Sequence, residues 1–130
     1  MTESVNVASI ISEKDLLDYV IEYAQAKNWR VAHFRPGMTS RVDKRGRPIW
    51  VTPVQADGKG FPDLILIRRD ELGGRFIVAE LKSENGKVTK AQQEWLGILT
   101  YLAGYSSPSA RMEVYIWRPS DRDALERVLE

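Results

Sequence analysis

Cysteine is absent from this chain of 130 residues, and histidine occurs only once. The first absence excludes disulfide bonds and thiolate metal sites, and the second excludes a metal site built from several histidines. No apolar stretch approaches the roughly 20 residues that a membrane span requires. The amino terminus has no basic flank followed by an apolar run. We therefore expect no membrane partner and no signal peptide, and we predict a cytoplasmic protein.

What is present is the ordinary composition of a globular protein, with 43% hydrophobic and 28% charged residues. A chain of this length supports one hydrophobic core, so a single domain over residues 1–130 is expected.

The net charge of +1 hides a basic block at residues 27–47, where seven basic residues stand against one acid. Such a block in a near-neutral protein indicates a patch that faces a polyanion. The alternative is a solvated loop whose charge only keeps it soluble, and Lys59 has the same two interpretations. The candidate nucleic-acid contacts are Arg35, Arg41, Lys44, Arg45, Arg47 and Lys59.

Residues 60–82 contain two apolar runs, Leu64 to Ile67 and Phe76 to Ala79, on either side of a polar break at Asp70 to Gly74. This pattern predicts a β-hairpin. Both runs are apolar at odd and even positions, so we expect both faces of each strand to be buried, as in the middle of a sheet covered by helices.

The hairpin brings charged residues together. If Arg69 faces Gly74, then Asp63 lies opposite Glu80, and opposed residues share a face. Lys82 is two residues beyond Glu80 and shares that face as well. A register slipped by one residue would separate them. Two adjacent carboxylates repel each other unless a proton or a cation lies between them. A hard divalent ion such as Mg²⁺, which carboxylates bind, would explain such a pair.

A helix is predicted from Glu13 to about Lys27, with Ser12 as its N-cap. Glu13 lies on the apolar side of this helix, seven residues before Val20. Two interpretations remain open for Glu13. An acid is favourable at a helix N-terminus in any case, or it is a third carboxylate that reaches the metal site.

A second helix is predicted from Thr89 to about Ala103, with a core stripe of Trp95, Leu96, Leu99 and Leu102. Thr89 and Gln92 match the capping box. Further strands are predicted at residues 29–35, 49–53 and 112–117, and a last helix, opened by Ser120, at residues 121–129. The order of elements predicts an α/β fold with helices on both sides of a central mixed β-sheet.

Pro62-Asp63, followed after a gap by Glu80-Leu81-Lys82, resembles the signature of the PD-(D/E)XK nucleases. The surrounding residues, Gly60 to Leu64, Ala79 to Lys82 and Thr89 to Leu96, are similar to the VRR-Nuc branch, the virus-type replication-repair nucleases. The resemblance covers about residues 13–129. It implies a restriction-endonuclease-like core and a metal-dependent DNA endonuclease.

The resemblance also implies roles for individual residues. Asp63, Glu80 and the backbone carbonyl of Leu81 would ligate Mg²⁺ or Mn²⁺, and Lys82 would orient a water or stabilise the transition state. A helix-borne glutamate like Glu13 occurs in many PD-(D/E)XK nucleases. A glutamine at the place of Gln92 recurs beside VRR-Nuc active sites, so this side chain has two competing roles, in the cap and in the site.

Stand-alone VRR-Nuc proteins of viral and bacterial type resemble Holliday-junction resolvases. The resemblance therefore implies branched or duplex DNA as substrate, a homodimer, and the cytoplasm of a bacterial or phage-infected cell, with no organic cofactor. A restriction-like or homing endonuclease that cuts a fixed sequence is the runner-up. Two other classes stay open: a catalytically silent DNA-binding module, and a protein in which Asp63, Glu80 and Lys82 form only a structural salt-bridge cluster.

Overall fold

The computed structural model describes residues 7–34, 37–51 and 55–130. Its centre is a four-stranded mixed sheet in the order β1-β4-β5-β6. The pairs β1–β4 and β4–β5 are antiparallel, and β6 runs parallel to β5. The α/β class with a restriction-endonuclease-like core is therefore confirmed. The strands are β1 (Arg30–His33), β4 (Leu64–Asp70), β5 (Gly73–Leu81) and β6 (Ala110–Trp117).

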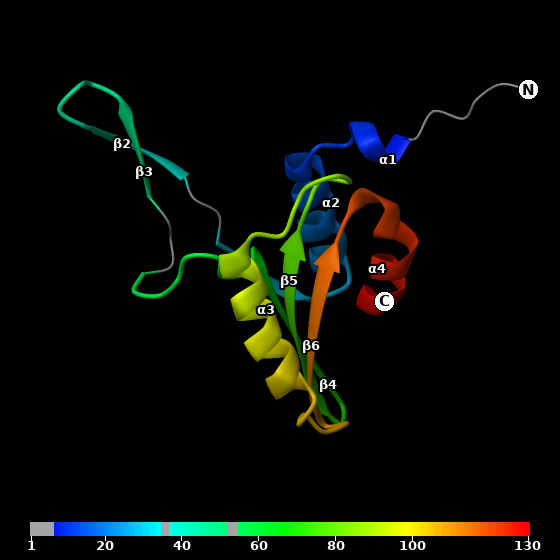
Figure 1. Ribbon diagram of the computed structural model, residues 1–130. Helices are drawn as coiled ribbons and strands as arrows, with labels where there is room; N and C mark the ends of the chain where they lie inside the picture. The colour runs from blue at the N-terminus through cyan, green and yellow to red at the C-terminus, as the bar shows by residue number, and fades with distance from the viewer. Residues whose placement is uncertain (1–6, 35–36, 52–54) are drawn as a thin grey trace, which may run out of the picture.

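Helices cover both faces of this sheet, as predicted (Figure 1). The helices are α1 (Val7–Ile10), α2 (Glu13–Ala26), α3 (Lys90–Ala103) and α4 (Arg122–Leu129). The main core lies between the sheet and the pair α2 and α4, where Val20, Leu66, Ile77 and Leu125 are fully buried. On the opposite face α3 packs along β6. Within the described residues, no helix is long and apolar enough to cross a membrane.

The predicted register of the β4–β5 hairpin is confirmed, because Arg69 faces Gly74 and Leu64 faces Ala79. The turn is tighter than predicted, since Asp70 and Gly73 still pair. The prediction that both faces of the hairpin strands are buried is confirmed for residues 77–81 of β5. It is wrong for Ile67, which is 44% exposed. Ile67 lies on the α3 side of the sheet, where, among the described residues, α3 packs mainly along β6 and leaves β4 less covered.

The basic block contributes to a separate two-stranded antiparallel sheet of β2 (Gly37–Val42) and β3 (Pro48–Val51). The sequence predicted a strand at residues 49–53 but none over residues 37–42, which form β2 and pair with β3. Figure 1 shows the β2–β3 hairpin standing away from the central sheet. Asp43 closes its turn by accepting hydrogen bonds from the backbone N–H groups of Arg45 and Arg47 at 2.8 and 3.0 Å.

Three local expectations are wrong. The last helix begins at Arg122 rather than Asp121, because the residues before it form a short 3₁₀ turn, Pro119–Asp121. Asp121, rather than Ser120, caps the start of the 3₁₀ turn, because its carboxylate accepts the backbone N–H of Arg118 at 2.8 Å. Leu102, placed in the core by its spacing, is 51% exposed.

Candidate metal centre

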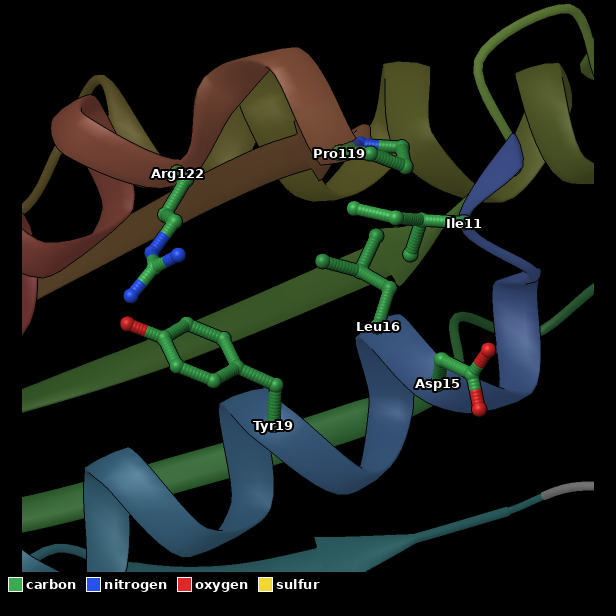
Figure 2. Close-up of a pocket in the computed structure, with 6 residues that line it drawn as sticks. All are labelled: Ile11, Asp15, Leu16, Tyr19, Pro119 and Arg122. Atoms are coloured by element: carbon green, nitrogen blue, oxygen red, sulfur yellow. The ribbon is translucent and has the colours of Figure 1, made fainter. Parts of the chain in front are cut away.

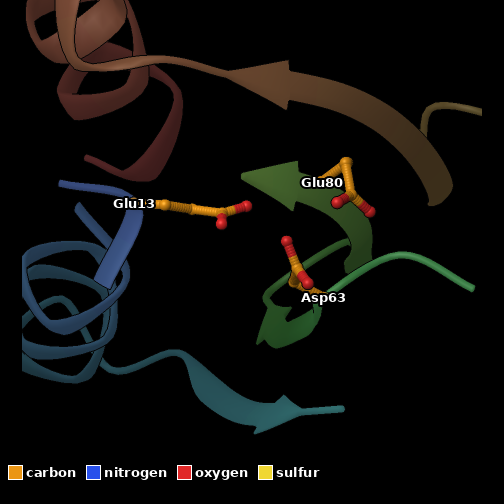
Figure 3. Close-up of side chains that lie close together, drawn as sticks. All are labelled: Glu13, Asp63 and Glu80. Atoms are coloured by element: carbon orange, nitrogen blue, oxygen red, sulfur yellow. The ribbon is translucent and has the colours of Figure 1, made fainter. Parts of the chain in front are cut away.

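Three carboxylates meet at the rim of the central sheet (Figure 3). Glu13 opens α2, Asp63 immediately precedes β4, and Glu80 lies near the end of β5. One carboxylate oxygen of each residue lies within 4.8 Å of the others. The functional interpretation of Glu13 is therefore supported by geometry, because its side chain reaches from the helix to the pair that the hairpin register brings together.

Two hydrogen bonds from backbone N–H groups hold Asp63, one at its side chain and one at its carbonyl. Its side-chain Oδ2 accepts the N–H of Leu81 at 2.8 Å, and its carbonyl accepts the N–H of Phe34 at 2.7 Å. The approach to Asp63 depends on Gly60, whose φ of +85° is in the left-handed region. A Cβ on Gly60 would lie 2.5 Å from the backbone carbon of Ala91. Glycine is required here both for its dihedral angle and for the close approach of α3.

Glu80 is the most constrained of the three carboxylates, with only 1% of its surface exposed. Its Oε1 accepts the side-chain N–H of Gln92 at 3.0 Å. Its Oε2 is buried and has no hydrogen-bond partner among the described residues. Burial and the negative charge of Asp63 raise the pKa of Glu80 to about 8, and Lys82 opposes the rise. In this arrangement Glu80 binds either a proton or a cation.

The Gln92 side chain contacts both Thr89 in the helix cap and Glu80 in the cluster, although these two contacts were expected to compete. Its Oε1 accepts the backbone N–H of Thr89 at 2.8 Å, and its backbone N–H donates to the Thr89 hydroxyl at 3.2 Å, which completes the capping box of α3. Its Nε2 is then free to donate to Glu80. An amide has an acceptor at one end and donors at the other, so one side chain joins the helix start to the carboxylate.

Lys82 is also buried, with 9% exposure, and its backbone N–H donates to the carbonyl of Trp117 at 3.0 Å. The loop that follows Lys82 is held by Arg118, which the sequence did not single out. One guanidinium nitrogen, Nη1, donates to the carbonyls of Ser83 at 2.8 Å, Glu84 at 3.2 Å and Gly86 at 2.7 Å. No motif marks an arginine after a distant strand, so only the structure could identify it.

Two of the predicted nucleic-acid contacts lie at the tip of the β2–β3 hairpin. Lys44 and Arg45 are exposed in the turn between β2 and β3. Arg47 lies beside them and forms an ion pair with Asp43 at 2.9 Å. Lys59 is exposed on the loop before Gly60. Arg35 and the side chain of Arg41 lie outside the described residues.

A separate hollow of about 250 Å³ lies between α2 and the segment that leads into α4 (Figure 2). Its wall is mainly apolar, and the ring of Tyr19 lies under the guanidinium of Arg122. None of the three carboxylates lines it. The lining residues are Ile11, Asp15, Leu16, Tyr19, Pro119 and Arg122.

Comparison with known proteins agrees with this geometry. The family model for the VRR-NUC domain matches residues 37–110, which is more than half of the chain and includes Asp63, Glu80, Lys82 and Gln92. No curated protein and no solved structure gives a significant match. The extent of the family match, together with the mixed sheet and the motif on its hairpin, shows that the chain belongs to the VRR-NUC family of PD-(D/E)XK nucleases.

Proposed function

We propose that this nuclease is a divalent-metal-dependent DNA endonuclease in which Glu13, Asp63 and Glu80 hold Mg²⁺ or Mn²⁺. Two observations on Glu80 carry the proposal together: its carboxylate lies in the cluster with those of Glu13 and Asp63, and its buried Oε2 has no hydrogen-bond partner among the described residues. A buried carboxylate oxygen without a partner is costly. A cation supplies the missing partner and at the same time relieves the repulsion between the acids.

The donor set fits such an ion. Carboxylate oxygens are the ligands that Mg²⁺ prefers. One oxygen from each of the three acids lies within 4.8 Å of the others, so the acids are gathered closely enough to hold a single ion among them. The backbone carbonyl of Leu81 is a further candidate ligand in our proposal, because the N–H of the same residue already binds Asp63.

When bound, a divalent ion supplies Lewis-acid activation of a water and of the scissile phosphate. The protein's own residues have separate tasks. Asp63, at the entry to β4, and Glu80, near the end of β5, fix the position of the site at the rim of the sheet. Lys82 places a buried positive charge where negative charge develops on the phosphate, or orients the attacking water. Gln92 holds the Glu80 carboxylate in one orientation through its side-chain N–H.

DNA is proposed to be held by its phosphates rather than by its bases. The exposed Lys44 and Arg45 at the tip of the β2–β3 hairpin, together with Arg47 and Lys59, supply positive charge that can contact phosphates whatever the base sequence. Arg35 and Arg41 belong to the same proposal on sequence grounds. We infer structure-selective cutting of branched DNA by a homodimer. The second candidate, cutting at a fixed sequence, requires base contacts that this hairpin would have to make.

The test is cleavage of labelled duplex, flap and four-way-junction DNA in Mg²⁺, Mn²⁺ or EDTA. We compare the wild type with Asp63→Asn and Lys82→Met, and use Glu71→Gln, in the exposed turn of the β4–β5 hairpin, as the matched control. Metal-dependent cutting of the junction that both site variants lose and the control keeps would support the proposal.

Other outcomes discriminate between the alternatives. Cuts at one fixed sequence in plain duplex would retain the chemistry and favour the second candidate. Salt-sensitive DNA binding without cutting would indicate a silent binding module. Cutting that survives both site substitutions would refute the assignment of the site.

A further inference from the structure

Lys82 follows β5 at the point where β5 and β6 end side by side. Leu81 pairs with Trp117, and the backbone N–H of Lys82 donates to the carbonyl of Trp117 at 3.0 Å. The two strands are parallel, so their last residues lie at the same edge of the sheet (Figure 1). The residues that follow them, Lys82 and Arg118, therefore leave the sheet as neighbours, although they are distant in the sequence.

A tight turn of residues 83–86, here called the Lys82 turn, folds back beside the lysine side chain. The backbone N–H of Gly86 donates to the carbonyl of Ser83 at 3.1 Å and closes the turn. A Cβ built on Gly86 would lie 3.5 Å from Cδ of Lys82, so the glycine adjoins the lysine stem. Lysine has a long and flexible stem. The turn is one wall of the space that this stem occupies, and it limits the positions of the amine.

One nitrogen of Arg118 fixes the shape of the Lys82 turn. Nη1 donates to the carbonyls of Ser83, Glu84 and Gly86 at 2.7 to 3.2 Å. Three carbonyl oxygens that converge on one point are unfavourable unless a donor lies between them. A second contact joins the same two segments, because Oε2 of Glu84 accepts the backbone N–H of Ser120 at 3.0 Å. The conformation of the turn therefore depends on the segment that follows β6.

We propose that Arg118 is a positioning residue for Lys82, because it holds the turn that keeps the lysine amine in place at the metal centre. The effect runs from the guanidinium through the carbonyls of the turn to the lysine stem. The inference rests on the proposed function, in which Lys82 acts on the phosphate or on the attacking water. A catalytic group must be held within about 0.5 Å of its productive position. A misplacement of about 1 Å can slow a reaction about a hundredfold.

Two other roles for Arg118 predict different results. An arginine that binds a DNA phosphate directly would change the affinity for DNA and leave the rate of the chemical step unaltered. An arginine that only stabilises the fold would lower activity no more than any other substitution of equal cost to stability. The separate values of kcat and KM, compared with those of a matched variant elsewhere in the protein, distinguish these roles.

The first test measures kcat and KM in Mg²⁺ for the DNA that the wild type cuts, at a temperature at which circular dichroism shows all variants folded. Arg118→Met retains an apolar stem and removes the donors. Arg68→Met is the matched control, because Arg68 also donates to three backbone carbonyls at 2.8 to 3.2 Å, beside the end of α4. We expect kcat to fall about tenfold or more in Arg118→Met, with KM within about twofold of the wild type, and neither to change in Arg68→Met.

A conservative variant adds a rescue. All three hydrogen bonds to the turn use one nitrogen of Arg118, and a lysine ammonium carries three donors on one nitrogen. Arg118→Lys should therefore recover part of the kcat that Arg118→Met loses. An unchanged kcat in Arg118→Met, a raised KM with an unchanged kcat, or an equal loss of kcat in Arg68→Met would each overturn the inference.

Chemical labelling of the lysine amine gives a second readout that needs no DNA. Reductive methylation with formaldehyde and a borohydride, followed by mass spectrometry, compares Lys82 with the exposed Lys59 and Lys90 in metal-free protein. We expect Lys82 to react several times faster in Arg118→Met than in the wild type or Arg68→Met. Equal reaction of Lys82 in all three proteins would overturn the inference. Faster labelling in Arg118→Met, with a wild type that cuts no DNA, would refute only the proposed function.

Discussion

Replacing Glu80 by glutamine should make the metal-free protein more stable at high pH. In the wild type the raised pKa of about 8 means that folded Glu80 retains its proton at a pH where the unfolded chain has lost it. The unfolded state then binds fewer protons than the native state. Stability therefore falls as pH rises from about 4.5 to about 8 and is constant above that range. An amide does not ionise, so Glu80→Gln should lack this loss.

The size of the effect follows from the pKa. Each pKa unit corresponds to about 1.4 kcal/mol, which gives an upper limit of about 5 kcal/mol for the whole shift. Structural relaxation and water entry reduce the cost of a buried charge, so we expect about 2 kcal/mol of stability to be lost. For a chain of this size that corresponds to a decrease of about 6 °C in Tm between pH 5 and pH 9.

The assay is thermal unfolding in EDTA at pH 5, 7 and 9 for the wild type, Glu80→Gln and the exposed control Glu71→Gln. The wild type and the control should lose stability with pH, and Glu80→Gln should not. Adding Mg²⁺ at pH 9 should restore the wild type, because a ligand that binds only the folded state stabilises it. A wild type with a flat profile, or a Glu80→Gln protein with the wild-type slope, would refute the reasoning.

Four further substitutions test the supports of the site. Gln92→Ala and Thr89→Ala should each cost about 1 kcal/mol in thermal unfolding through the lost capping box, but only Gln92→Ala should also slow DNA cutting, by about tenfold or more. Gly60→Ala should cost about 3 kcal/mol by urea unfolding, because its dihedral angle and the contact with Ala91 are both unfavourable to a methyl group. Arg118→Met should cost about 2 kcal/mol and increase hydrogen exchange in residues 83–86, whose carbonyls lose their donor.

Each of these predictions has a result that would contradict it. Equal loss of cutting in Gln92→Ala and Thr89→Ala would mean that only helix capping matters. A Gly60→Ala protein as stable as the wild type would mean that the loop rearranges freely. Unchanged exchange at residues 83–86 would show that Arg118 does not hold the loop.

The central part of the site could be predicted from the sequence because strand pairing is periodic. A register in which Arg69 faces Gly74 places Asp63 beside Glu80, and the structure has that register. Glu13 could be placed on the inner side of its helix by its spacing from Val20. Neither argument required a knowledge of tertiary packing, since both depend on local geometry.

The remaining features depend on contacts between distant segments. The spacing of Leu102 predicts burial, but α3 packs mainly on β6, which leaves the flank of the helix that carries Leu102 exposed. Arg118 binds carbonyls more than 30 residues away. The double role of Gln92 was interpreted as a competition because spacing does not indicate that the two ends of one amide can serve different partners. These facts follow from how the elements pack, which the pattern of a single segment does not encode.

The most direct test of the central claim is Mn²⁺ binding to the wild type and to Asp63→Asn, measured by electron paramagnetic resonance at pH 8, with Glu71→Gln as control. Asparagine can still accept the N–H of Leu81, so the fold should persist while one carboxylate charge is lost. We predict one saturable site in the wild type and the control, displaced by Mg²⁺ and strongly weakened in Asp63→Asn. Equal binding by all three proteins, or no saturable binding by the wild type, would contradict the account.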